Sequence, residues 1–251
     1  MGRSLAEAVE MALAKRYRNR ISRRVHAGAG GVVRHGPFAG MRLENGSHIS
    51  DGPLALKVLG LYEQDLMDEV TARRWDALVN LGGGDGFYPV GMVRGGLAGR
   101  AVVFEMRAEG RETIQRNARA NGVADAIVLH GAAGPDWHER VLADGVSPED
   151  ALVLCDIEGA EFELLDAASV GALAGATFMV ELHHPLVADG ARKLEALHAS
   201  FAPTHGVRTI KATPPRWGGM EEVERMRDLE RALVTCEGRK MLGEWLIAVP
   251  R

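Results

Sequence analysis

The chain has 251 residues, of which 46% are hydrophobic and 25% are charged, so it can bury a sizeable core and has the composition of an ordinary globular protein. Its formal net charge of −4 offers no general attraction for nucleic acid, and no apolar stretch approaches the roughly 20 residues that span a bilayer. The first residues are amphipathic and lack the apolar centre of a signal peptide. We therefore expect a cytoplasmic protein with no membrane segment and no nucleic-acid partner.

The N-terminal part of the chain differs in character from the rest. Residues 5–24 have the pattern of a helix with a basic end, and residues 26–40 are rich in glycine and predict a loop or a short strand. Residues 56–73 carry apolar side chains at helical spacing, and no independent core is evident in this region. We predict that residues 1–70 form a helical cap or lid, whose first helix could pair with a second copy in a homodimer.

From residue 75 onward, short apolar runs alternate with helical segments. Apolar runs with little alternation indicate strands of a parallel sheet that is buried on both faces. The expected strands cover residues 76–82, 101–106, 126–131, 151–156, 177–182, 207–213 and 244–250. We predict an α/β fold in which residues 71–251 form a Rossmann-like domain, with a seven-stranded, mostly parallel sheet and helices on both faces.

A glycine-rich loop follows the first expected strand. Its glycines Gly82, Gly84 and Gly86 allow positive φ angles and a close approach of the backbone to a ligand. The next strand ends in Glu105, at the distance along the chain where a carboxylate can bind a ribose diol. The dinucleotide pattern G-x-G-x-x-G does not fit, because its third glycine would fall at Phe87 or Pro89. The loop predicts a nucleotide-type site of another kind, and a tight turn without a ligand is the alternative.

Five segments together resemble the FkbM-type methyltransferases, which use S-adenosylmethionine (SAM). They are VNLGGGDGFYPVG, VVFEM, RANG, LCDIEGAEFELL and MVELHH, and they lie between about residues 75 and 185. The D-x-E-G-x-E and E-x-H patterns are the most specific of these features. The resemblance implies a class I methyltransferase fold, SAM as cofactor, and methyl transfer to a hydroxyl of a small molecule such as a sugar or a secondary metabolite. An RNA or protein methyltransferase and a non-catalytic SAM-binding protein are the alternatives.

The same resemblance implies which residues bind the cofactor. The expected cofactor-binding residues at the ends of the strands are Asn80, Gly82, Gly84, Asp85, Gly86, Glu105, Met106, Gly131, Ala132 and Asp156. Among them, Glu105 would bind the ribose hydroxyls and Met106 would pack on the adenine. Tyr62 and Glu63 of the cap could close over the cofactor, although ordinary helix amphipathicity also explains this pair. The N-terminal segment and residues 211–233 depart from simpler members, so we expect them to determine acceptor specificity.

Acidic and histidine side chains follow two of the expected strands. Asp156 and Glu158 end the fourth strand, and Glu181, His183 and His184 end the fifth. Because the carboxyl ends of neighbouring parallel strands lie about 4.8 Å apart at one edge of the sheet, these groups would converge if the two strands are adjacent.

Three roles are open to this group. In the first, which we expect, a metal-free base accepts the proton of the acceptor hydroxyl: His183 or His184, since histidine titrates near neutral pH, or a carboxylate such as Asp156 or Glu158. In the second, Asp156, Glu158, Glu181 and His183 bind a divalent metal that lowers the pKa of the acceptor. In the third, the acids only cap the following helix. In the same segment, we expect Glu161 to orient the turn and Glu163 to be solvated.

Overall fold

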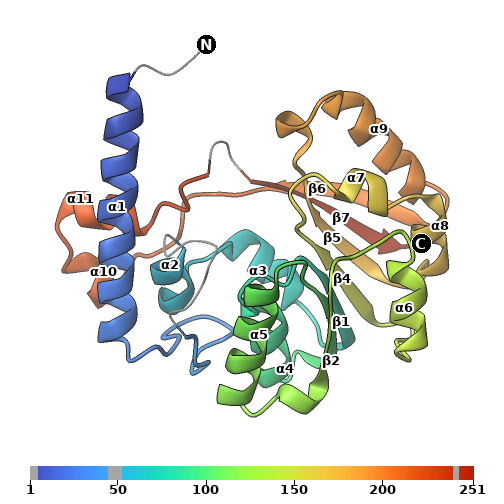
Figure 1. Ribbon diagram of the computed structural model, residues 1–251, viewed down its shortest axis with the longest axis horizontal. Helices are drawn as coiled ribbons and strands as arrows, with labels where there is room; N and C mark the ends of the chain where they lie inside the picture. The colour runs from blue at the N-terminus through green and yellow to red at the C-terminus, as the bar shows by residue number, and fades with distance from the viewer. Residues whose placement is uncertain (1–4, 45–52, 240–242) are drawn as a thin grey trace.

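The computed structural model describes residues 5–44, 53–239 and 243–251 and has a seven-stranded sheet at its centre (Figure 1). The sheet has the order β3-β2-β1-β4-β5-β7-β6, in which β1 to β5 are parallel and β7 runs antiparallel to both of its neighbours. The strands are β1 (Trp75–Leu81), β2 (Ala98–Phe104), β3 (Ile127–His130), β4 (Ala151–Cys155), β5 (Thr177–Glu181), β6 (His205–Lys211) and β7 (Glu244–Pro250). The predicted mostly parallel sheet is confirmed, and each expected strand corresponds to an observed one.

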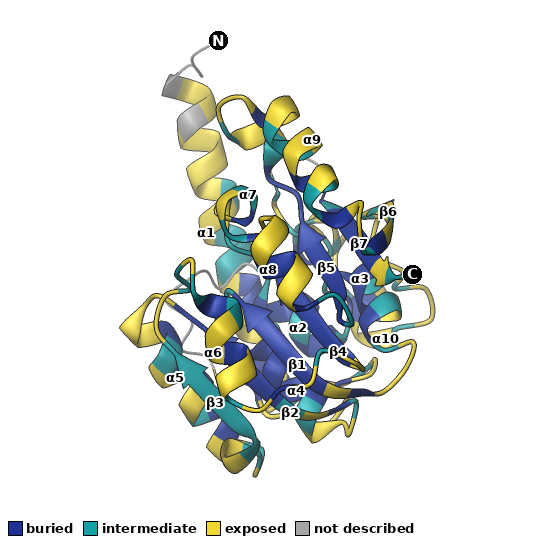
Figure 2. Cartoon of the chain, turned by 90° about the vertical axis from the view of Figure 1, so that its right-hand side faces the viewer, coloured by how far each residue is buried: buried dark blue, intermediate teal, exposed yellow. Residues whose placement is uncertain are grey.

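Helices cover both faces of the sheet, as predicted (Figures 1 and 2). Successive strand residues point to opposite faces, so Leu78 packs with the helices of one face and Val79 with those of the other. The first face carries α4 (Phe87–Arg94) and α5 (Ala108–Ala120); the second carries α6 (Trp137–Ala143), α8 (Ala167–Ala172) and α9 (Gly190–Phe201). Burial on both sides explains why the strands are continuously apolar.

The cap contains α1 (Leu5–Gly28), α2 (Leu54–Leu59) and α3 (Gln64–Val70). The helix expected over residues 56–73 is therefore two helices, and this prediction is corrected. The break falls at Gly60, which ends α2 in the left-handed conformation with φ 70°. A Cβ atom at Gly60 would lie 2.2 Å from the carbonyl oxygen of His35, so the close approach of these two loops requires both the turn and the glycine.

The cap has a small apolar core that the sequence of residues 1–70 did not reveal. Ile21, Leu56 and Leu59 pack with Val223 and Val234, which belong to α10 (Glu221–Glu224) and α11 (Asp228–Val234). Part of this core thus comes from a segment more than 150 residues later in the chain, which no local pattern predicts. The division at residue 70 stays a prediction. None of the helices in the described ranges is long and apolar enough to cross a membrane.

Candidate active site

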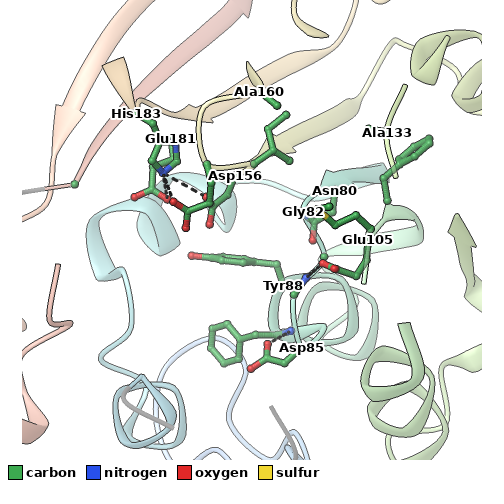
Figure 3. A pocket seen from close by; sticks show the side chains of 18 of the residues that line it. Asn80, Gly82, Asp85, Tyr88, Glu105, Ala133, Asp156, Ala160, Glu181 and His183 are labelled. Atoms are coloured by element: carbon green, nitrogen blue, oxygen red, sulfur yellow. Dashed lines mark hydrogen bonds and ion pairs between the residues drawn. The ribbon is translucent and has the colours of Figure 1, made fainter. Parts of the chain in front are cut away.

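A pocket of about 770 Å³ opens at the carboxyl ends of the parallel strands (Figure 3). It is lined by Asn80 from β1, Glu105 after β2, Asp156 after β4 and Glu181 from β5. In the sheet, β2 and β3 are added on one side of β1, and β4 and β5 are added on the other side. Ligands of open α/β sheets bind at such a topological switch point, here between β1 and β4, outside the carboxyl ends of the strands. The position of the pocket is therefore the one that the sheet topology favours for a ligand.

The glycine loop between β1 and α4 forms the floor of this pocket. Gly82 has φ 87°, and a Cβ atom there would lie 1.9 Å from the carbonyl oxygen of Asp156. A Cβ atom at Gly83, which the sequence analysis did not single out, would lie 2.4 Å from Val103. Gly84 also has a positive φ and lines the pocket. The loop must be made of glycine because it crosses directly over the ends of β2 and β4.

Two of the loop residues expected at the cofactor make contacts within the protein that hold neighbouring helices in place. Gly86 precedes α4 with φ 84°, faces Ile114 of α5, and does not line the pocket. Asp85 does line it, but its carboxylate binds Lys57 Nζ at 2.6 Å and accepts a hydrogen bond from the backbone of Phe87. Asp85 therefore fastens α2 of the cap to the start of α4.

The expected ribose and adenine residues lie together on one side of the pocket. The buried carboxylate of Glu105 accepts hydrogen bonds from the backbone N–H groups of Gly84 at 2.9 Å and Arg107 at 2.8 Å. Met106 is 74% exposed and lines the pocket beside it, as does Ala132. Gly131 is not a lining residue. A large exposed methionine at this rim gives a ligand ring an apolar surface on which to pack.

The two cap residues Tyr62 and Glu63 take different positions. Tyr62 lines the pocket, whereas Glu63 is buried beside it and accepts a hydrogen bond from the Tyr88 hydroxyl at 2.6 Å. Glu63 has a left-handed backbone with φ 46° and forms an ion pair with Arg239. Burial raises the pKa of Glu63 to about 7 against the opposing effect of Arg239.

Arg239 is a site residue that the sequence analysis missed. It follows α11 and pairs with Glu63, Glu181 and Glu237, so it joins the cap to the end of β5 at the pocket wall. The carboxylates raise the pKa of Arg239 further although its burial opposes them. No motif marks this arginine, because its partners come from segments far apart in the sequence.

The structure brings four of the predicted strand-end groups together. His183 Nε2 lies 3.8 Å from Asp156 Oδ1 and 4.0 Å from Glu181 Oε2 (Figure 3). It also lies 3.6 Å from Glu158 Oε2. They meet because β4 and β5 are adjacent in the sheet. His184 does not join them; it begins the 3₁₀ turn His184–Leu186 and does not line the pocket.

The acids of the segment that follows β4 separate into different environments. Glu161 is completely buried and accepts a hydrogen bond from the backbone N–H of Gly159 at 2.7 Å, which holds the turn. Glu163 is exposed, as expected for a solvated position. Burial acts to raise the pKa of Glu161, but the hydrogen bonds from His183 outweigh it and hold that pKa below its usual value. Glu161 is therefore an ionised, buried acceptor.

The charges around His183 change its protonation. Burial acts to lower its pKa, but the hydrogen bond and charge of Glu161, together with Glu181 and Asp156, raise it to about 9. Burial and the neighbouring carboxylates raise the pKa of Asp156 to about 6 and that of Glu181 to about 8. At pH 7 the imidazole of His183 is thus already protonated, and the expectation that it titrates near neutral pH is corrected. Because these three side chains interact strongly, they titrate together as one coupled group.

The raised pKa of Glu181 leads to a prediction about stability. Glu181 binds its proton more tightly in the folded state than in the unfolded state. Its contribution to the stability of the folded protein is therefore lost as the pH rises from 4.5, its ordinary pKa, to about 8. We expect the melting temperature of Glu181→Gln, relative to wild type, to increase over this pH range. Glu163→Gln, at an exposed position, is the control and should show no such trend. A pH-independent difference for Glu181→Gln, measured by thermal unfolding, would contradict the assigned environment.

The predicted metal ligands form a smaller group than expected. Among the described residues, donor atoms of Asp156, Glu158 and His183 lie within 4.8 Å of one another. Glu181 is directed to Arg239 by an ion pair instead. Mixed carboxylate and imidazole donors suit a divalent ion such as Mn²⁺ or Fe²⁺, so these three residues fit a metal.

Comparison with known proteins identifies the fold. No family model and no curated protein matches the chain. An O-methyltransferase from Bacillus cereus, solved in complex with SAH, is 11% identical, with a TM-score of 0.51 over 93% of this chain and 90% of that one. TomG, an O-methyltransferase from Streptomyces achromogenes solved with SAM, is 16% identical over 72% and 76% of the two chains, with a TM-score of 0.49. The C-terminal domain of precorrin-6Y C5,15-methyltransferase from Rhodobacter capsulatus is 21% identical over 74% and 86%, with a TM-score of 0.46. The chain has the Rossmann-like fold of class I methyltransferases.

Proposed function

We propose that the chain is a SAM-dependent methyltransferase that acts on a hydroxyl of a small molecule, as its resemblance to the FkbM type implies. The observation that carries this proposal is the glycine loop at the switch point of the sheet, where Gly82, Gly83 and Gly84 line the pocket and Glu105 stands beside them. Such a floor admits a ligand against the backbone itself. The similar Bacillus cereus structure is called an O-methyltransferase in complex with SAH.

The lining residues fit three parts of SAM. Asn80 and the glycine loop would hold the methionine end, and Glu105 would accept hydrogen bonds from the ribose hydroxyls. Met106 and Ala132 would border the adenine. SAM supplies an electrophilic methyl group on a sulfonium. The protein's task is then to place the acceptor oxygen in line with that methyl group, which provides most of the catalysis.

The strand-end cluster would receive the proton of the acceptor hydroxyl. Because the pKa of His183 is raised to about 9, its imidazole is a poor acceptor at pH 7, and Asp156, with a pKa of about 6, is largely ionised. We assign the proton to this cluster, with Asp156 as the carboxylate that accepts it and His183 as the group that stabilises the charge. His184 lies outside the pocket and has no role in this assignment.

A metal-assisted reaction is the second candidate, favoured by the close grouping of Asp156, Glu158 and His183. In it, these residues would hold a divalent ion that lowers the pKa of the acceptor hydroxyl. The two candidates differ in one measurable property, since only the second loses activity when metal ions are removed.

The test is the formation of SAH from SAM with a pool of small hydroxylated compounds, compared with bulk RNA as acceptor. We expect SAH with the small molecules, none with RNA, and the same rate after exhaustive EDTA treatment. Loss of activity with EDTA that Mn²⁺ restores would replace the metal-free mechanism by the metal-assisted one. Tight SAH binding without turnover on either pool would favour a non-catalytic SAM-binding protein.

A further inference from the structure

One buried carboxylate connects the ends of β4 and β5 beside the pocket. Glu161, which is 0% exposed, begins the short helix α7 (Glu161–Leu164) after β4. Its Oε1 atom accepts hydrogen bonds from the backbone N–H of His183 at 2.9 Å and from the ring Nδ1 of His183 at 3.1 Å. Its Oε2 atom accepts the backbone N–H of Gly159 at 2.7 Å. Both oxygens of this side chain are therefore engaged, two of the three bonds by the same histidine.

This arrangement determines which nitrogen of His183 faces the pocket. An ionised carboxylate only accepts hydrogen bonds, so the proton of the contact lies on Nδ1. The side chain of His183 is 9% exposed, which leaves the ring little freedom to turn. Its Nε2 atom is then directed between Asp156 at 3.8 Å and Glu158 at 3.6 Å, at the pocket wall.

A role limited to the turn would not require these contacts. The bond to Gly159 alone holds the loop after β4, and a backbone N–H needs only one acceptor oxygen. The other oxygen accepts hydrogen bonds from the backbone and the ring of His183, which lies two residues after the end of β5. Burial of a charge is costly unless hydrogen bonds compensate it, and two of the three hydrogen bonds that compensate the buried charge of Glu161 come from His183.

We propose that Glu161 is a positioning residue that holds the His183 ring with Nδ1 toward itself and Nε2 toward the acceptor side of the pocket. The proposal rests on the proposed function for its catalytic meaning, since Nε2 then faces the place where the acceptor oxygen would lie. Partners that orient a metal-ligating histidine through its other nitrogen typically change metal affinity or activity by about 10- to 100-fold when they are replaced.

The test is the NMR signal of the His183 ring in protein labelled with ¹⁵N-histidine, assigned by its loss in His183→Ala. In the wild type we expect an Nδ1-bound proton with a downfield shift and slow exchange with water. In Glu161→Gln this proton should move upfield, because a neutral amide oxygen is a weaker acceptor than a carboxylate. In Glu161→Ala it should exchange at least about tenfold faster, as expected for loss of the acceptor that protects it. Glu163→Gln is the matched control from the same helix and should leave the signal unchanged.

Several outcomes would overturn the proposal. The absence of an Nδ1-bound proton in the wild type would do so without any variant. A signal that both Glu161 variants share unchanged with the wild type would also do so. SAH affinity, measured by calorimetry on the same proteins, separates this proposal from the proposed function. We expect it to change less than about twofold in Glu161→Gln, because the Glu161 carboxylate bonds to Gly159 and His183 and not to the residues that would hold SAM in the proposed function. Wild-type protein that does not bind SAH would contradict the methyltransferase assignment and leave the Nδ1 contact intact.

Discussion

Glu105→Ala is expected to weaken the binding of SAH by about 10- to 100-fold while the protein stays folded. The carboxylate lies at the end of β2 on the pocket rim and is anchored by the backbone of Gly84 and Arg107. Hydrogen bonds to a charged group contribute about 1.5–3 kcal/mol each, and about 1.4 kcal/mol corresponds to a factor of ten in affinity. Isothermal titration calorimetry with SAH measures the change directly.

The control for this experiment is Glu109→Ala, which removes an exposed glutamate from the first turn of α5. It should bind SAH as the wild type does. If Glu105→Ala kept wild-type affinity with an unchanged melting temperature, the ribose would not be bound at the end of β2. The assignment of the glycine loop to a nucleotide-type ligand would then lose its main support.

Gly82→Ala is expected to lower the free energy of unfolding by at least about 3 kcal/mol, since strained φ angles and overpacking each cost about 1–3 kcal/mol. The residue has φ 87°, and its Cβ atom would lie 1.9 Å from a backbone oxygen of Asp156, which cannot move aside as a side chain can. Urea or guanidinium denaturation monitored by circular dichroism gives the difference.

Two other glycines separate the causes of this loss. Gly122 has φ 70° but open space around it, so Gly122→Ala should cost about 1 kcal/mol from the backbone conformation alone. Gly171 has open space and lies in α8, so alanine there should be neutral or slightly stabilising. A Gly82→Ala protein no less stable than Gly122→Ala would show that the loop can move away from β4.

Local pattern was sufficient for most of the fold. The strands were found because each one is buried on both faces and is therefore continuously apolar, which a short window of sequence reveals. The prediction of one helix over residues 56–73 was wrong, because the break at Gly60 depends on a contact with His35 between two loops. The cap core was missed for the same reason, since Val223 and Val234 come from a distant segment.

The candidate site was accessible from the sequence only in part. Asp156, Glu158 and His183 could be grouped in advance because the carboxyl ends of adjacent parallel strands must share one edge. Arg239 could not, because its partners Glu63 and Glu181 at the pocket wall lie far from it along the chain.

The amino-acid sequence by itself determined the elements and the order in which they occur: apolar runs that form strands, glycines where the backbone must turn, and carboxylates where strands end. These properties depend on a residue and its near neighbours. Only the tertiary structure decided how the groups at the strand ends behave. Packing buries His183 and Glu181 and places carboxylate oxygens of Asp156 and Glu181 within 4.0 Å of the His183 ring, which moves each pKa away from its ordinary value. Charge interactions depend on distance in space and on burial, and neither is written in the local sequence.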